Sequence, residues 1–388
     1  MTAGRDEHYA IGLALALGDR GISFDLVGSP AFAVPALINN PCVRLLPLRQ
    51  EKASANVLTR LLNVLAYYSR LARYAMASEA RVFHILWNNR FELFDRIVLS
   101  FYYKLLGKRI VFTAHNVNAG ERDSNDSWLN RWSLRVQYRR FDHIFAHTTR
   151  MKQEIVEGFN VCASKVSVIP YGINNVVPRT NLSTAEAKRR LGLGPRNKAM
   201  LFFGNITPYK GLEYLVKALA DVSRTDETYR LIIAGKPKWS DDYWHEVRTT
   251  IARSGVADVI IQKIEFIPDD ATEIYFKAAD VLVLPYTHIF QSGVLFLGYS
   301  FGLPVLSADV GSLKHEVVEG VTGFIFPPKD AASLARTIER YFSSDLYCEL
   351  GARRAAIKAW AEQRHSWNEV ARITADVYSE LLGRDCRA

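Results

Sequence analysis

The stretch LFFGNITPYKG at residues 201–211 decides the fold of this chain. Its apolar run is typical of a buried strand and ends at Gly204, after which a short loop leads to Lys210 and Gly211 ahead of a helical pattern. A glycine lets the backbone approach a ligand closely, and a lysine near a helix N-terminus offers positive charge to a phosphate. The stretch therefore predicts an anion-binding turn at the carboxyl end of a strand, although Lys210 could also be an ordinary surface lysine.

A second stretch, QSGV at residues 291–294, has the same organisation. The apolar run VLVLP at 281–285 precedes it, and small residues then open another helical pattern. The first N–H groups of a helix have no partner within the helix, so they can face an anion. Two such turns in one α/β unit predict a diphosphate clamp, to which Gln291 and Ser292 would add hydrogen bonds unless they form a plain loop.

The region from 201 to 330 resembles the donor-binding half of GT-B glycosyltransferases of the family 4 type. The positions that match the family pattern are Gly204, Lys210 and Gly211, then Gly302, Pro304 and Val305, and finally Gly311, Glu316, Val317, Val318, Gly320, Thr322 and Gly323. The resemblance covers nearly the whole chain. It implies an α/β fold of the GT-B class, with two Rossmann-like domains facing a central cleft and a C-terminal helix that crosses back to the first domain.

The resemblance also implies which residues bind a nucleotide diphosphate sugar. The expected donor-binding residues are Gly204, Asn205, Lys210, Gly211, Gln291, Ser292, Gly293, Val294 and Glu316. Lys210 is in addition expected to act in catalysis, on the leaving diphosphate. For Glu316 the alternative is that it only stabilises the positive end of a helix.

Three positions depart from the family pattern. Asn205 stands where the family has an arginine, and Ile289 and Leu297 stand where the family has two carboxylates. In the family these carboxylates contact the donor sugar and the nucleotide ribose. The polar Gln291 and Ser292 lie in the loop instead, which is typical of a subgroup variant, and a degenerate pseudo-enzyme is the alternative.

Short apolar runs alternate with helical patterns along the chain, which is typical of parallel α/β layers. Eleven strands are expected at 22–28, 81–87, 109–117, 143–147, 165–170, 199–203, 230–234, 258–262, 281–284, 304–307 and 323–326. We expect three parts: an N-terminal acceptor-binding domain at 1–175, a nucleotide-sugar-binding domain at 176–366, and a final helix at 367–388 that packs on the first domain.

The N-terminus has an unusual pattern for such a domain. A nucleotide-binding α/β domain opens with a buried strand that leads into a glycine-rich turn. The opening sequence MTAGRDEHY resembles that turn and its helix, with no strand before it. We therefore expect the first domain to lack its usual first strand, so that a helix at 6–20 and a strand at 22–28 flank an unfilled slot or a rearranged neighbour.

Two residues of the first half are candidates for catalysis. His115 ends an apolar run at the edge where ligands bind in open α/β sheets, and the family also carries a histidine at this strand end. It could donate to a sugar hydroxyl or relay a proton, or simply cap a loop. Glu121 follows in the same loop and could orient the acceptor or His115, or serve as a base, unless it is only a solvated carboxylate.

The formal net charge of +9 belongs mainly to the first half of the chain, where Lys and Arg outnumber Asp and Glu by 22 to 14 through residue 176. The stretch 57–77 combines Leu, Tyr and Arg at helical spacing. That pattern suits an anionic membrane surface, or else a core-facing helix with a solvated Arg edge. No cofactor, metal constellation or nucleic-acid partner is expected, and the location is expected to be cytoplasmic, at most peripheral to the membrane.

These features predict a hexosyltransferase that moves a sugar to a hydroxyl of a glycan or polyprenyl-linked acceptor in cell-surface polysaccharide synthesis. The family resemblance implies that the transfer retains the anomeric configuration. Two alternatives stay open. A GT-B sugar-nucleotide epimerase would need cleft carboxylates in both domains, and positions 289 and 297 lack them. A non-catalytic subunit that binds a sugar nucleotide or a glycan would need only the donor turns, and assays of donor hydrolysis or transfer separate it from an enzyme.

Overall fold

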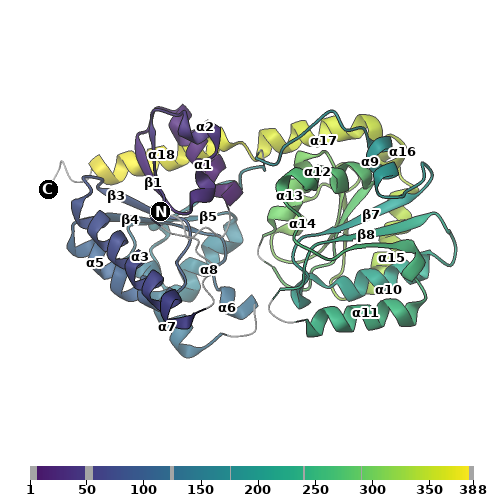
Figure 1. Cartoon of the computed structure of the whole chain (residues 1–388), viewed down its shortest axis with the longest axis horizontal. Helices are drawn as coiled ribbons and strands as arrows, with labels where there is room; N and C mark the ends of the chain where they lie inside the picture. Colours follow the sequence, from purple (N-terminus) through teal and green to yellow (C-terminus); the bar gives the residue numbers. More distant parts are fainter. Residues whose placement is uncertain are drawn as a thin grey trace. The chain divides into compact units, whose positions relative to one another are not determined.

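The computed structural model of the chain describes residues 7–48, 56–122, 126–174, 176–238, 241–289 and 291–383. The chain divides into two compact units, Met1–Gly172 with His365–Ala388 and Ile173–Arg364. Each unit is a layered α/β structure with parallel strands, which confirms the predicted fold class (Figure 1).

The first unit contains two parallel sheets. A two-stranded sheet pairs β1 with β2, and a four-stranded sheet has the order β3-β4-β5-β6. The strand bounds are β1 Phe24–Val27, β2 Val43–Leu46, β3 Val82–Ile85, β4 Arg109–Ala114, β5 His143–Ala146 and β6 Val166–Val168. The prediction that this unit lacks its usual first strand concerns residues 1–6, which lie outside the described residues, so it is not tested.

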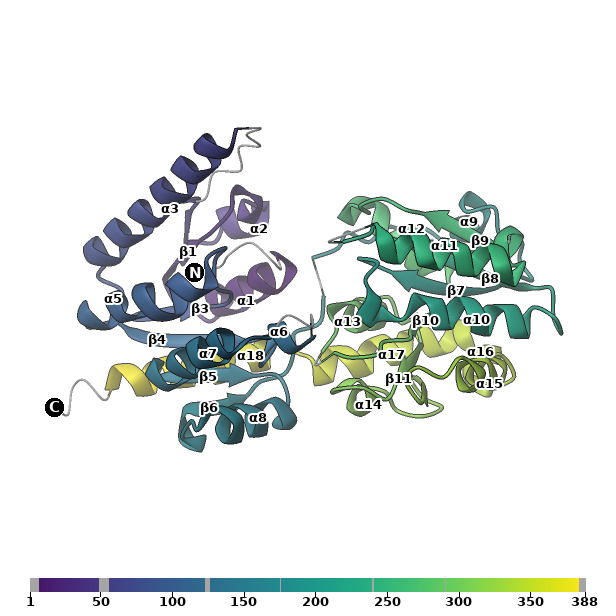
Figure 2. The same ribbon diagram turned by 90° about the horizontal axis from the view of Figure 1, so that it is seen from below.

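Helices cover both faces of the four-stranded sheet. Figures 1 and 2 show α1 and α18 on one face and α3, α5 and α7 on the other. The helix bounds in this unit are α1 Glu7–Asp19, α2 Pro35–Ile38, α3 Val57–Ala77, α4 Glu92–Phe94, α5 Ser100–Leu105, α6 Ala119–Arg122, α7 Trp128–Arg140, α8 Thr149–Phe159 and α18 Trp367–Gly383. A short π-helical turn, Asp95–Leu99, joins α4 to α5.

The second unit has one six-stranded parallel sheet with the order β12-β11-β10-β7-β8-β9. Its strands are β7 Lys198–Phe203, β8 Tyr229–Ala234, β9 Ile260–Lys263, β10 Val281–Leu284, β11 Val305–Ala308 and β12 Gly323–Phe326. Its helices are α9 Thr184–Arg190, α10 Leu212–Val222, α11 Asp242–Ser254, α12 Asp269–Ala278, α13 Gly293–Ser300, α14 Leu313–Glu316, α15 Ala331–Phe342, α16 Asp345–Cys348 and α17 Leu350–Arg364.

A buried ion pair fixes β7 beside β10 in this sheet. The Asp280 carboxylate, just before β10, accepts from the Lys188 ammonium at 2.8 Å and from the backbone N–H of Ala199 in β7 at 2.8 Å. A buried charge needs such a partner because its desolvation is expensive. The pair therefore sets the register of the two strands whose far ends carry the predicted anion-binding turns.

All eleven predicted strands are present, and β2 is the strand among the described residues that the sequence analysis missed. The residues of β2 are half-buried or exposed, and the strand pairs only with β1. A partly solvated strand of four residues gives neither a continuous apolar run nor a clean alternation, so its pattern does not stand out from a loop.

The last helix packs against the first. The indole of Trp367, at the start of α18, fills the space beside Gly12 of α1: a side chain built at Gly12 would place its Cβ 2.3 Å from Trp367 Cε2. The same construction at Gly172 also gives 2.3 Å. Two glycines therefore make room for one indole where the chain returns to its first unit.

This contact predicts opposite effects for two helical glycines. Gly158→Ala in α8 meets no atom within 4 Å and should stabilise the protein by about 0.5–1 kcal/mol, through helix propensity. Gly12→Ala gains the same propensity but collides with Trp367, so it should destabilise by roughly 1–3 kcal/mol. Thermal melting of both variants tests this, and an equal stabilisation by the two would contradict the packing described.

Candidate functional site

The end of β7 brings three predicted donor-binding residues together. Gly204 follows β7 with a φ of +90°, a conformation that favours glycine. A Cβ at Gly204 would lie 3.0 Å from Lys210 Nζ and 3.6 Å from Val294 Cγ2. The turn after β7 and the start of α13 are therefore in contact, with the backbone of Gly204 at their junction. Asn205, the next residue, is exposed.

Lys210 is a buried cation. It ends the short turn Pro208–Lys210, is only 6% exposed, and donates from Nζ to the carbonyl of Phe203 at 3.3 Å. Among the described residues the structure records no carboxylate paired with it. Burial, with a smaller contribution from the positive charge of Lys238, lowers the pKa of Lys210 to about 7. A buried ammonium without a counter-charge is suited to bind an anionic ligand.

Gly211 ties this turn to the end of β10. It has a φ of +63°, and a Cβ there would lie 2.2 Å from the carbonyl oxygen of Pro285. The N–H of Thr287 donates to the carbonyl of Tyr209 at 2.8 Å. The two loops predicted from separate stretches of sequence thus form one structure at the carboxyl ends of β7 and β10.

The loop before α13 carries polar atoms without partners. Both amide atoms of Gln291 are shielded from solvent and have no hydrogen-bond partner among the described residues, and the same holds for Thr207 Oγ1. Ser292 Oγ lies 3.3 Å from the hydroxyl of Tyr286 and makes no cap to α13, which begins at the exposed Gly293. Buried polar atoms are normally paired, so these atoms indicate a place for a polar ligand.

Thr207 and Tyr286 were not predicted from the sequence. Thr207 is completely buried within the loop between Gly204 and Lys210, and Tyr286 is completely buried beside Ser292. A threonine in that loop was the one available signal. The position of Tyr286 follows from tertiary packing, and sequence spacing does not show it.

The two family carboxylate positions are buried and apolar here. Ile289 and Leu297 are each 8% exposed. Neither side chain can form a hydrogen bond with a sugar or a ribose. The polar side chains nearest to Ile289 in the same loop are the neutral groups of Gln291 and Ser292. This departure, expected from the sequence, distinguishes the loop of this chain from the family pattern.

Glu316 has partners within its own unit. It ends α14, is 7% exposed, and lies 3.7 Å from Arg364 Nε. The Tyr299 hydroxyl donates to its backbone carbonyl at 2.7 Å. These contacts support a structural role for Glu316, and its contact with a donor stays a prediction.

In the first unit, His115 lies in an aromatic cluster at the carboxyl ends of the strands. Its ring stacks on Trp87 with centroids 4.2 Å apart and planes 4° apart, and Tyr9 meets it edge-on at 4.6 Å. His115 Nδ1 is 3.1 Å from His147 Nε2, so one of the two rings donates to the other. Trp87, His115 and His147 follow β3, β4 and β5 respectively.

Both histidines of this cluster are neutral at pH 7. Burial, and after it the neighbouring His147 ring, holds the pKa of His115 well below its usual range. Burial lowers the pKa of His147 to about 4. His115 Nε2 is shielded from solvent and has no partner among the described residues. A neutral imidazole of this kind can donate or accept a hydrogen bond but is a weak base. The sequence analysis did not predict the partners Tyr9, Trp87 and His147.

Glu121 lies in the short helix α6, and its side chain is outside the described part of the chain. Its role therefore stays a prediction. No cluster of three or more His, Cys, Asp or Glu residues suited to a metal ion occurs in the described ranges.

Two family models match the chain, one in each half. The model for Glycosyltransferase Family 4 matches residues 7–175, and the model for Glycosyl transferases group 1 matches residues 197–344. The chain is 31% identical over 247 residues to a D-inositol 3-phosphate glycosyltransferase from Acidothermus cellulolyticus, and the aligned region covers 62% of this chain and 54% of that protein. It is 30% identical over 240 residues to an uncharacterized glycosyltransferase from Methanocaldococcus jannaschii, covering 60% of each. The match thus spans about half of the first relative and three fifths of the second.

Solved structures share the fold over nearly the whole chain. The Anabaena protein HepE, in complex with UDP and glucose, superposes with a TM-score of 0.75 at 19% identity, covering 97% of this chain and 96% of that one. Sucrose-phosphate synthase from Thermosynechococcus elongatus superposes with a TM-score of 0.76 at 18% identity, covering 96% and 92%. The first unit therefore matches a family 4 glycosyltransferase model, the second matches a group 1 glycosyltransferase model, and the chain as a whole has the GT-B fold.

Proposed function

We propose that this protein transfers a sugar from a nucleotide diphosphate sugar to a hydroxyl acceptor. The observation that carries the proposal is the buried Lys210 ammonium, which lies against Gly204 and has no carboxylate partner among the described residues. A diphosphate would supply the missing negative charge, and the free N–H groups at the start of α13 would add hydrogen bonds. HepE, a structure of similar fold, binds UDP together with glucose and also UDP-glucose, which supports a donor of this class.

Lys210 would act on the leaving group. In the transfer, the bond between the anomeric carbon and the diphosphate oxygen breaks, a bond to the acceptor oxygen forms, and the proton of the acceptor hydroxyl passes to the departing diphosphate. Negative charge builds up on the diphosphate as the bond breaks, so a preorganised cation stabilises the transition state more than the ground state. The family resemblance supports retention of the anomeric configuration.

Neutral groups would recognise the donor sugar. The unpartnered amide of Gln291 and the hydroxyls of Thr207 and Ser292 offer donors and acceptors where the family has carboxylates. In the first unit, the neutral His115 would form a hydrogen bond with a sugar hydroxyl through Nε2. It would not act as the base that removes a proton, because burial holds its pKa well below the usual range and so makes it a weak base. Glu121 is the proposed group for orienting the acceptor.

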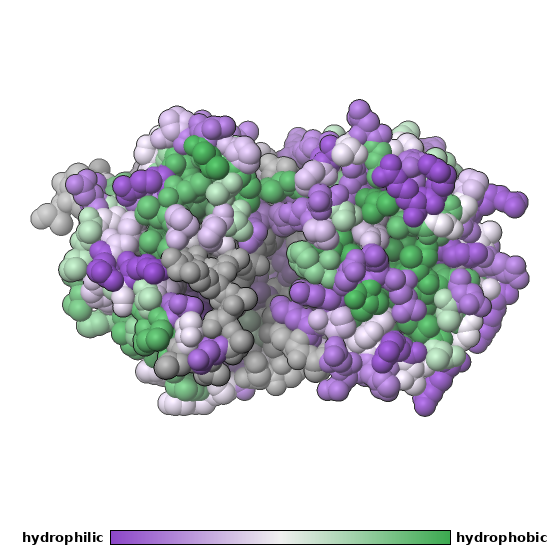
Figure 3. All heavy atoms as spheres, viewed as in Figure 1, coloured by the Kyte–Doolittle hydropathy of each residue, from purple (hydrophilic) through white to green (hydrophobic). Residues whose placement is uncertain are grey.

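The surface of the first unit supports an acceptor at a membrane surface, such as a polyprenyl-linked saccharide. Fifteen of the eighteen exposed large hydrophobic side chains among the described residues belong to this unit. They include Leu61, Leu62 and Leu65 of α3. In Figure 3 green apolar residues are interspersed with purple polar ones on this face of the first unit. Exposed apolar side chains beside Arg residues favour an anionic bilayer surface. No described helix has the length and apolarity needed to cross a membrane.

A panel of nucleotide sugars tests the function directly. The cognate donor should raise the melting temperature, by an amount equivalent to about 2.7 kcal/mol at 100 times its dissociation constant. The same donor should then yield a glycoside with a suitable hydroxyl acceptor. Donor stabilisation with neither hydrolysis nor transfer for any acceptor tried would favour the non-catalytic binding subunit.

We expect Lys210→Ala to lower the transfer rate roughly 100-fold, or about 3 kcal/mol, because a charge-assisted contact to the leaving group is lost. The matched control is Lys217→Ala, which removes an exposed lysine from α10 of the same unit and should leave the rate unchanged. Steady-state kinetics measure both variants, and melting curves check that both are folded. A Lys210→Ala enzyme as fast as the wild type would exclude Lys210 from the mechanism.

Donor binding should take up a proton above neutral pH. In the free protein the pKa of Lys210 is about 7, so at pH 8 roughly nine tenths of the side chain is neutral, and the diphosphate restores the charged form. Calorimetric titration with a nucleotide sugar, in buffers of different ionisation enthalpy, should give an uptake approaching one proton at pH 8 and little at pH 6. Lys210→Met should abolish the uptake. Equal proton counts for the two proteins at pH 8 would contradict the assignment.

The first unit should bind anionic vesicles. Leu62→Glu in α3 should weaken sedimentation with phosphatidylglycerol vesicles several-fold, because it removes apolar surface and adds negative charge. Ile38→Glu in α2 is the matched control, since the two side chains are 56% and 58% exposed, and it should have little effect. Binding should also fall with salt. Equal sedimentation with neutral and anionic vesicles, or none, would refute the membrane surface.

A further inference from the structure

The loops that follow β7 and β8 stay paired beyond the ends of the two strands. Within the sheet, β7 and β8 pair in parallel as far as Phe203 and Ala234. Farther on, the N–H of Ile206 donates to the carbonyl of Lys236 at 2.8 Å. The N–H of Lys238 in turn donates to the carbonyl of Ile206 at 3.2 Å. Backbone hydrogen bonds therefore hold the loop after β8 beside the candidate diphosphate-binding turn.

A glycine allows the two loops to approach this closely. Gly235, directly after β8, has a φ of +153°, and a Cβ there would lie 1.8 Å from the carbonyl oxygen of Gly204. A larger residue at 235 would push the loops apart, because the contact is made by backbone on both sides. The stretch GKPK at 235–238 thus brings two lysines against the turn that carries Lys210.

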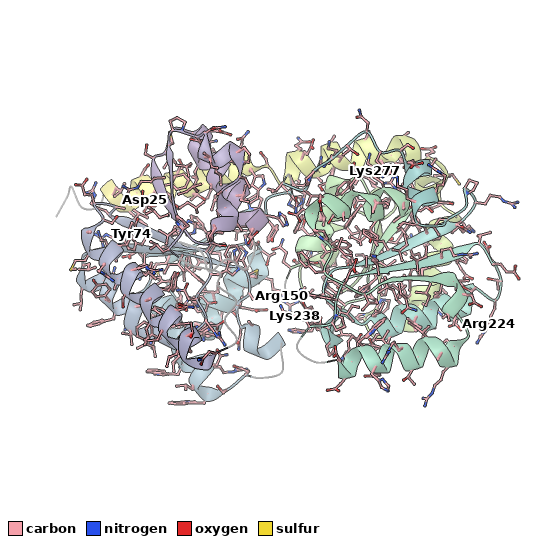
Figure 4. The ribbon with its side chains drawn as sticks, viewed as in Figure 1. Asp25, Tyr74, Arg150, Arg224, Lys238 and Lys277 are labelled. Atoms are coloured by element: carbon pink, nitrogen blue, oxygen red, sulfur yellow. The ribbon has the colours of Figure 1, made fainter. Side chains whose placement is uncertain are left out.

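The register of the paired loops places the side chain of Lys238. Ile206 and Pro237 form a parallel bridge, so their side chains share one face of the paired loops. Successive side chains of extended segments alternate between faces, which puts Thr207 and Lys238 on the opposite face. Asn205 belongs to that opposite face as well. Lys238 is exposed, and Figure 4 labels its side chain. The cation therefore lies on the face of the position where the family has an arginine.

The charge of Lys238 reaches Lys210. The Lys210 ammonium lies over the rings of Phe202 at 5.8 Å and Tyr286 at 5.6 Å, which offer it no negative charge. After burial, the cause that lowers the pKa of Lys210 is the positive charge of Lys238. A like charge has this effect only from nearby. Two cations on neighbouring loops thus repel one another, and a ligand with more than one negative charge would relieve that repulsion.

We propose that Lys238 is a second cation of the donor site and binds the diphosphate together with Lys210, in place of the arginine that the family carries at position 205. This inference rests on the proposed function. Each phosphate of the diphosphate is negatively charged, so one ammonium neutralises only part of its charge. The amide of Asn205 can donate a hydrogen bond but supplies no charge. A lysine on a flexible stem can supply that charge from the neighbouring loop.

The affinity of the full chain for inorganic pyrophosphate tests this assignment. Lys238→Met should weaken binding about tenfold at low salt, because it removes a charge-assisted contact. The loss should shrink at high salt, since an exposed charge is screened. Lys236→Met is the matched control. It removes an exposed lysine from the same loop, which lies over the ring of Phe266 at 5.2 Å, and should change the affinity less than about twofold.

A double-mutant cycle tests whether Lys238 replaces the family's arginine. In the Lys238→Met protein, Asn205→Arg should recover most of the lost affinity for pyrophosphate. In the wild-type protein the same substitution should gain much less, because the second charge is already present. A purely structural role of Lys238 would not be rescued in this way. Equal gains in the two backgrounds would overturn the replacement.

Proton uptake tests whether the two ammonium groups are neighbours. Without the charge of Lys238, the pKa of Lys210 in the free protein should rise, so binding of pyrophosphate at pH 8 should take up fewer protons. Unchanged uptake in Lys238→Met would show that the two groups lie too far apart to share one diphosphate, and would overturn the inference.

The same titrations separate this inference from the proposed function. If Lys238→Met binds pyrophosphate as tightly as the wild type while Lys210→Met binds it weakly, the second cation is excluded and the donor site at Lys210 remains. If the wild-type protein binds neither pyrophosphate nor any nucleotide sugar, the proposed function falls together with the role of Lys238.

Discussion

The burial of parallel strands on both faces is the constraint on which the sites of this protein depend. Such strands leave polar backbone free only where they end, so ligand groups must gather at their carboxyl ends. Gly204 follows β7, Gln291 follows β10, and His115 follows β4. The Asp280–Lys188 pair, at the opposite end of β7 and β10, keeps these two strands in register without entering the site. The chemistry of each unit is therefore set by which side chains the loops place at one edge of a sheet.

The parts of the candidate donor site that are local in sequence could be placed from the sequence. Gly204 and Lys210 lie on one strand, loop and helix, whose pattern specifies both the turn and its charge. The parts that depend on contacts between distant segments could not. The link from Gly204 to Val294, the orphaned hydroxyl of Thr207 and the completely buried Tyr286 arise only when β7 and β10 pair. The spacing of residues along the chain does not predict that β7 pairs with β10.

The first unit shows the same division. His115 was predicted because it ends an apolar run, whereas His147 was only the last residue of the expected strand 143–147. The pairing of β4 with β5 brings a nitrogen of each ring to 3.1 Å from the other, and burial lowers the pKa of both rings so that they stay neutral well below pH 7. A sequence identifies a histidine, but its protonation state depends on desolvation, which only the fold determines. The prediction of a proton relay at His115 is for this reason less well supported than one of hydrogen bonding.

The two units differ in the kind of polar side chain that they bury near the ends of their strands. In the second unit, Lys210 is held in an environment that disfavours its charge, so the free protein gains little from that charge until an anion arrives. In the first, His115 and His147 share one hydrogen bond as neutral rings, and the shielded Nε2 of His115 has no partner among the described residues, so it can serve a hydroxyl. A charged leaving group and an uncharged sugar make different demands. A cation poised to regain its charge suits the diphosphate, while a neutral imidazole can bind a hydroxyl without attracting a second anion. The difference between the two sites is thus in keeping with the proposed donor, whose diphosphate is charged and whose sugar is not.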